Sequence, residues 1–240
     1  MYNELNIEKI LKTIARLEAR INERIPNSNI SKVCGELHIT ARGVQARIDK
    51  LTRPNMWVRG GVIALLCLFF SVLIYTLNIL EWTIVKPNLA GIIQLSEALI
   101  NDVILVGAAL FFLITFEQRL KRREVLKELH KLRSIAHVVD LHQLTKDPSM
   151  LHYDREPTEN SPERNMPEFE LQRYLDYCSE MFSMIGKLAA LFSERLPEPS
   201  IVSAANDIES LCTDLSRKVW QKMVFLGSRS NQEIEKMGIS

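Results

Sequence analysis

Residues 60–80 form an uncharged stretch of 21 residues with the sequence GGVIALLCLFFSVLIYTLNIL. As an α-helix this stretch would be roughly 31 Å long, which matches the thickness of the hydrocarbon core of a bilayer. The core helices of soluble proteins rarely contain so long a run without a charge. The sequence therefore predicts a membrane-spanning helix, which we place at residues 57–80.

A second apolar stretch follows at residues 103–116, VILVGAALFFLITF, and it is too short to cross a bilayer alone. Extending it back to Gly91 gives a sufficient length. A re-entrant or interfacial helix is the alternative, but the flanking charges favour a full crossing. We therefore expect a second membrane-spanning helix at 99–117, in a helix that begins near residue 91, and a short external loop at 81–98.

Basic residues flank both apolar stretches on the side away from this loop, which contains Lys86 as its one basic residue. Because positively charged flanks stay on the cytoplasmic side, we expect both termini in the cytoplasm and a location in a bacterial inner membrane. The basic residues that precede the first stretch are Arg42, Arg47, Lys50, Arg53 and Arg59, and those that follow the second are Arg119, Lys121, Arg122, Arg123 and Lys127.

The remainder of the chain has helical periodicity, and we find no strand pattern. A helical extension is expected at 118–146, an acidic proline-rich linker at 147–167, a helical hairpin at 168–228 with a stop at Gly227, and a flexible tail at 229–240. The extension has a packed apolar stripe of Val125, Leu129, Leu132, Ala136 and Val139. Residues 168–196 have apolar side chains at alternating steps of four and three, which is a heptad seam. The predicted fold is all-α: two transmembrane helices with a cytoplasmic antiparallel helical bundle. The seam consists of Leu171, Leu175, Cys178, Phe182, Ile185, Ala189 and Phe192.

Residues 1–56 are predicted to be a basic, helical, cytoplasmic segment. An amphipathic helix is expected at 6–23, and a break follows at residues 26–29. The sequence ISKVCGELHITARGVQARIDKL at 30–51 resembles the helix-turn-helix of Lrp-type transcription regulators, with His38 where a turn glycine is expected. That resemblance implies DNA contacts through Arg42, Gln45 and Arg47. One continuous amphipathic helix with its basic side near lipid headgroups explains the same residues, and we prefer it because the tether to the membrane is short.

Histidine and aspartate side chains cluster between residues 130 and 142. On a helix His130, His137 and Asp140 share one face, while His142 points elsewhere. One hypothesis is a metal or proton-transfer site. The hypothesis we prefer is a polar layer inside the bundle that sets helix register, formed by His137, Asp140 and His142 with Arg173 and Asp176.

No nucleotide-binding or nucleophile motif is found, so we predict neither catalysis nor a cofactor. Glu97 and Asp102 could form an acidic ring at the outer mouth of an oligomeric cation channel. The alternative, which we prefer, is an ordinary helix start just outside the hydrocarbon. The four cysteines are far apart and form no CxxC, so we expect them to be reduced and packed as small apolar residues.

Three segments, RSIAHVVDLHQLTKDP at 133–148, FELQRYLDYCSEM at 169–181 and LSRKVWQKM at 215–223, resemble a bacterial family of two-span membrane proteins without an assigned activity. Residues 1–59 have 11 Lys/Arg against 6 Asp/Glu, and residues 134–240 have 11 against 17, so the two parts could dock on each other. We expect a homo-oligomeric scaffold with membrane lipids and a cytoplasmic protein as partners. A transport-associated protein and a tethered DNA-binding regulator are the alternatives.

Overall fold

The computed structural model describes residues 5–52, 56–83, 89–146, 148, 159 and 166–236. These residues form six helices and no strand. For some helical residues, Gln45 among them, the backbone alone is described. The predicted linker at 147–167 lies outside the described residues except at positions 148, 159, 166 and 167, and so does the centre of the predicted external loop, residues 84–88.

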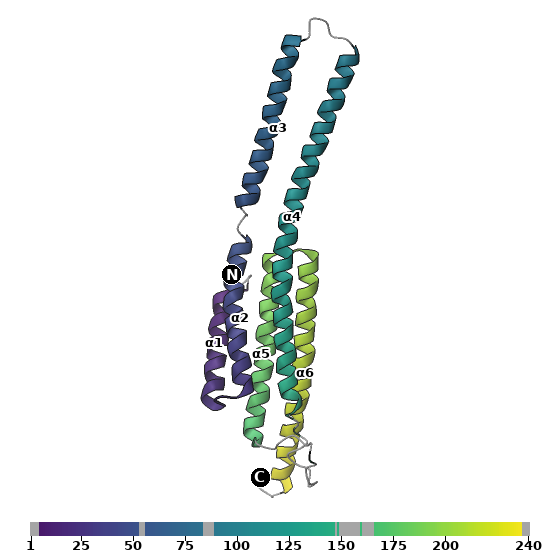
Figure 1. The fold of residues 1–240 in the computed structure, drawn as a ribbon. Helices are drawn as coiled ribbons and strands as arrows, with labels where there is room; N and C mark the ends of the chain where they lie inside the picture. The colour runs from purple at the N-terminus through teal and green to yellow at the C-terminus, as the bar shows by residue number, and fades with distance from the viewer. Residues whose placement is uncertain are drawn as a thin grey trace. The chain divides into compact units, whose positions relative to one another are not determined.

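The chain divides into two compact units. One consists of residues 53–124 and is called the apolar hairpin below. The other consists of residues 1–52 and 125–240 and is called the helical bundle. Figure 1 shows the helices of both units.

The apolar hairpin contains α3 (Met56–Thr83) and the first part of α4 (Leu89–Leu144), which run antiparallel (Figure 1). Both helices contain a stretch that is long and apolar enough to cross a membrane, and neither stretch is buried inside the structure. Gly61 of α3 lies beside Leu113 of α4, because a Cβ atom at Gly61 would be 3.7 Å from the Leu113 Cδ2 atom. The two helices predicted from apolar length are therefore present.

The helical bundle begins with α1 (Ile7–Arg24) and α2 (Asn29–Thr52), which pack on each other as an N-terminal hairpin. The side chain of Asn6 caps α1 by accepting hydrogen bonds from the backbone N–H groups of Glu8 and Lys9, at 2.9 and 3.2 Å. Asn27 lies in the turn with a φ of 58°, a conformation that asparagine tolerates better than most residues.

The bundle is completed by residues 125–144 of α4, by α5 (Glu168–Arg195) and by α6 (Pro199–Lys236). Helices α5 and α6 pack along each other, and the N-terminal hairpin packs on α5 (Figure 1). All seven residues of the predicted heptad seam in α5 are buried, and so are the predicted apolar residues of α4. The buried residues of α4 that were predicted are Val125, Leu129, Leu132, Ala136 and Val139.

The structure distinguishes the two interpretations of residues 30–51. These residues belong to the single continuous helix α2, so the helix-turn-helix interpretation is wrong and the preferred interpretation of one helix is confirmed. Ile39 is 73% exposed, whereas a helix-turn-helix would bury it in the angle between its two helices.

The predicted stop of the last helix at Gly227 is corrected, because α6 continues to Lys236. A glycine costs only about 1 kcal/mol inside a helix, and the following Gln, Glu and Ile residues propagate it.

Candidate interaction site on the helical bundle

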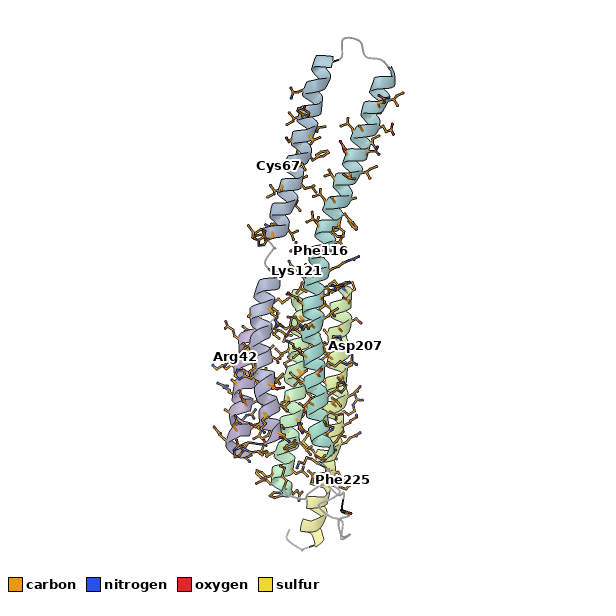
Figure 2. The ribbon with its side chains drawn as sticks, in the orientation of Figure 1. Arg42, Cys67, Phe116, Lys121, Asp207 and Phe225 are labelled. Atoms are coloured by element: carbon orange, nitrogen blue, oxygen red, sulfur yellow. The ribbon has the colours of Figure 1, made fainter. Side chains whose placement is uncertain are left out.

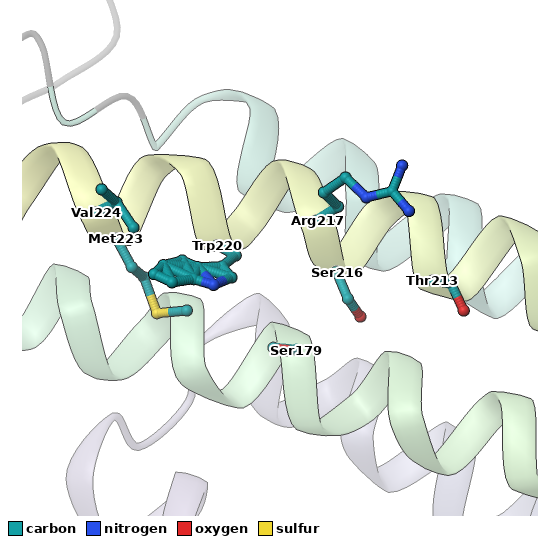
Figure 3. Close-up of a pocket in the computed structure, with 7 residues that line it drawn as sticks. All are labelled: Ser179, Thr213, Ser216, Arg217, Trp220, Met223 and Val224. Atoms are coloured by element: carbon teal, nitrogen blue, oxygen red, sulfur yellow. The ribbon is translucent and has the colours of Figure 1, made fainter.

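An open groove lies between α5 and α6 on the surface of the bundle, with a volume of about 590 Å³ (Figure 3). Its apolar side is provided by Trp220, Met223 and Val224, and Trp220 and Val224 are 54% and 46% exposed. These two residues are one helical turn apart, and Val219, which precedes Trp220, is buried in the core. The described residues that line it are Ser179, Thr213, Ser216, Arg217, Trp220, Met223 and Val224, and we call this surface the α5–α6 groove.

Two polar side chains of this groove make local contacts within α6. The Thr213 hydroxyl donates to the backbone carbonyl of Glu209 at 2.8 Å, and the Arg217 Nη1 atom lies 3.7 Å from the Asp214 Oδ1 atom. Among the described residues that line the groove there is no cysteine, histidine or carboxylate. Tryptophan and arginine are among the residue types most enriched at the centres of protein–protein interfaces.

The five residues expected to form a polar layer do not form one. His137 and Arg173 are exposed, while Asp140, His142 and Asp176 are partly buried. Asp140 accepts from the Gln143 amide at 2.7 Å, and Arg173 lies 3.6 Å from Asp176 on its own helix. Burial raises the pKa of Asp176, and the nearby Arg173 partly offsets this. The side chains on α4 and those on α5 therefore make local contacts instead of one shared layer.

The polar residues that the described bundle does bury are Glu128 and Gln143, at 3% and 1% exposure. The Glu128 carboxylate pairs with Arg47 of α2 and with Lys131, whose Nζ atom is 3.0 Å away. The burial of Glu128 was not predicted from the sequence. The available signal was its place among the buried positions of α4, three residues after Val125 and one before Leu129.

Lys222 of α6 caps the C-terminal end of α4. Its Nζ atom donates to the backbone carbonyls of Gln143 and Lys146, at 2.8 and 3.3 Å. The last carbonyls of a helix lack partners inside the helix and carry partial negative charge, so a lysine there is favourable. The Tyr174 hydroxyl donates to the carbonyl of His142 at 3.5 Å, and burial raises the pKa of this tyrosine.

The N-terminal hairpin contacts α5 through apolar and charged groups. Arg20 pairs with Glu180, which raises the pKa of Arg20, and its guanidinium lies 5.9 Å from the centre of the Tyr177 ring. Ile14 and Leu17 are fully buried in the same core. The basic N-terminal segment and the acidic C-terminal part thus contact each other within one chain.

Inside the N-terminal hairpin, Glu18 and His38 join α1 to α2. The Glu18 Oε2 atom is 2.5 Å from His38 Nδ1, and Arg42 Nε donates to His38 Nε2 at 3.2 Å. Of the residues predicted to contact DNA, Arg42 therefore contacts His38 and Arg47 pairs with Glu128. The side chain of Gln45 lies outside what the structure describes. Figure 2 shows Arg42 at the surface of the bundle.

The metal hypothesis has no ligand set in the described part of the chain, where no group of three or more His, Cys, Asp or Glu residues is arranged to hold a metal ion. His130 and His137 are both exposed. His130 borders a small pocket of about 50 Å³ between α4 and α6, together with Arg133 and Asp207. In the apolar hairpin, Glu97 and Asp102 are exposed on α4.

Three of the four cysteines are buried in the bundle: Cys34, Cys178 and Cys212. Burial raises the pKa of the Cys34 and Cys212 thiols to about 12, and it also raises the pKa of Cys178. All four cysteines are free thiols, and Cys67 is exposed on α3 (Figure 2).

Comparison of this chain with protein-family models, with curated proteins and with solved structures finds no match.

Proposed function

We propose that this chain is an integral membrane protein that anchors a helical interaction module. In this proposal α3 and the apolar part of α4 cross the bilayer, both termini lie in the cytoplasm, and the helical bundle binds protein partners there. In this proposal the module binds a partner and carries no catalytic function.

The observation that carries the membrane part is the placement of apolar side chains in the apolar hairpin. Trp57, Leu105 and Phe111 are 90%, 72% and 73% exposed, and they belong to helices whose apolar stretches have no buried residue. Exposing apolar surface to water costs about 25 cal/mol per Å², so a hairpin of this kind requires an apolar surrounding. The bundle behaves differently, because its apolar stripes face an interior core.

A matched pair of substitutions tests the membrane part. Leu68 in α3 and Leu141 in the bundle part of α4 are each 62% exposed. If α3 crosses a bilayer, Leu68→Arg places a charge near its centre at a cost of about 2.5–3.5 kcal/mol of insertion energy, whereas Leu141→Arg is tolerated. The measurement is the fraction of protein that resists alkaline carbonate extraction from membranes. Equal extraction of the two variants, or reporter fusions at the two termini on opposite membrane sides, would overturn the proposal.

The interaction part rests on the α5–α6 groove and on the exposed Trp220. We propose that the full chain is a homo-oligomer and that this groove binds a protein partner. Native mass spectrometry of the detergent-solubilised protein reads the stoichiometry of the complex. If the groove binds another copy of this chain, Trp220→Asp is expected to lower the number of chains in the complex. An unchanged number assigns the groove to a different protein. A strictly monomeric wild-type protein contradicts the oligomer.

A further inference from the structure

The end of the apolar part of α4 is marked by four basic residues within five positions: Arg119, Lys121, Arg122 and Arg123. Arg119, Arg122 and Arg123 are exposed, and at 3.6 residues per turn they lie within about 100° of one another around the helix. They span about 6 Å along the helix axis. Lys121 lies on another side and pairs with Glu117 at 2.8 Å. We call Arg119, Arg122 and Arg123 the arginine cluster.

The start of α3 lies at the same end of the apolar hairpin as this cluster. Because Gly61 lies beside Leu113 and the helices are antiparallel, residue 57 is level with about residue 117 of α4. Trp57 is 90% exposed there, and Arg59 is exposed as well. Tryptophan and arginine at the end of an apolar helix are typical of the headgroup layer of a membrane. In the part of α4 before residue 103, the exposed charged residues Glu97 and Asp102 are acidic.

We propose that the arginine cluster binds the phosphate groups of anionic phospholipids of the phosphatidylglycerol class. This inference rests on the proposed membrane crossing. Each headgroup layer is about 5–8 Å thick, which is close to the length of the cluster along the helix. The guanidinium group presents a fork of donors that matches two phosphate oxygens. Arg119 and Arg123 have no ion-pair partner among the described residues, so their charge is available to a lipid.

The neighbouring residues favour a lipid over a free phosphate or a nucleic acid. Phe116 and Leu120 are 48% and 44% exposed and lie between or just before the arginines, so a ligand at this place contacts apolar and cationic groups together. A phospholipid has both an acyl chain and a charged phosphate. An inorganic phosphate or a nucleic-acid backbone has no group for the apolar side chains.

Tryptophan quenching in vesicles tests the lipid preference in the full chain. The variant Trp82→Phe/Trp220→Phe retains Trp57 as its one tryptophan, and Trp57 lies at the level of the cluster. It is reconstituted into vesicles of phosphatidylcholine and phosphatidylglycerol in which one of the two lipids has brominated acyl chains. We expect brominated phosphatidylglycerol to quench Trp57 with a preference of at least about fivefold, which corresponds to about 1 kcal/mol for one basic residue near the surface.

The triple variant Arg119→Gln/Arg122→Gln/Arg123→Gln is expected to lose this preference and to retain quenching by brominated phosphatidylcholine. The control Arg16→Gln/Arg133→Gln/Arg173→Gln removes the same charge from exposed positions of the bundle and is expected to keep the preference. Equal quenching by both lipids in the wild-type cluster overturns the lipid inference but leaves the membrane crossing intact. Quenching by neither lipid overturns the membrane crossing itself.

Discussion

The guanidinium of Arg47 on α2 pairs with the carboxylate of Glu128 on α4, and this carboxylate is 3% exposed. A buried carboxylate without a cation is costly, because it has lost its water and gained no partner. The pair therefore ties the end of α2 to α4 within the bundle.

Arg47→Gln is expected to destabilise the bundle by about 1–3 kcal/mol, since it leaves Glu128 buried with Lys131 as its remaining cation. The apparent melting temperature of the solubilised protein measures the effect. Lys32→Gln, at an exposed position of the same helix, is the control and is expected to change stability by less than about 0.5 kcal/mol. Adding Glu128→Gln to Arg47→Gln should recover part of the loss, and equal effects of Arg47→Gln and Lys32→Gln would contradict the role of the pair.

Docking of the N-terminal hairpin on α5 is expected to depend more on apolar burial than on charge. Leu17→Ala should reduce the unfolding free energy by about 2–5 kcal/mol, because the Leu17 side chain is fully buried in the core. Arg20→Gln should cost less than about 1 kcal/mol, because Arg20 and Glu180 are 50% and 38% exposed. Hydrogen exchange of the α1 amides measures the docking. A large loss of protection in high salt, with little effect of Leu17→Ala, would show that charge dominates instead.

Much of this architecture follows from sequence periodicity. The heptad seam in α5 and the apolar stripe of α4 were predicted residue by residue, because a burial stripe needs only the 3.6-residue period and the side-chain types. The buried charge of Glu128 and the contact of Lys222 with the end of α4 were not predicted. Both contacts depend on which helices pack together and on how far each helix is shifted along its axis relative to its neighbour. A single sequence does not specify that shift. The helix-turn-helix resemblance failed for a related reason: residues 30–51 have the apolar spacing of a helix-turn-helix, but no residue there interrupts the helix.

Lys222→Met is expected to reduce the stability of the last turn of α4. The substitution keeps most of the side-chain volume but removes the donor to the carbonyls of Gln143 and Lys146. The loss should be about 1–2 kcal/mol, as for a hydrogen bond to a charged group at a helix end. Hydrogen exchange of the amides near residue 144 measures it. Lys218→Met, at an exposed position one turn earlier in α6, is the control, and an equal effect there would argue against the cap.

The stability of the bundle is expected to fall as the pH rises above about 9. Burial raises the pKa of the Cys34 thiol from 9.0 to about 12, so the folded chain keeps this proton while the unfolded chain releases it. The stabilising contribution of Cys34 is therefore complete below pH 9 and is lost progressively as the pH approaches 12. Cys34→Ala should reduce the slope of unfolding free energy against pH by up to about 1.4 kcal/mol per pH unit. Denaturant titrations between pH 8 and 11 measure the slope, and an unchanged slope would contradict this prediction.

The bundle is assembled from two separated parts of the chain, residues 1–52 and 125–240. During synthesis α1 and α2 leave the ribosome before α5, and their apolar face stays uncovered until α5 has been made. At 5–20 residues per second this delay is on the order of ten seconds. The apolar hairpin emerges during the same interval, so the nascent chain exposes two apolar surfaces at the same time. The time for which these surfaces stay uncovered would then limit the yield of native protein.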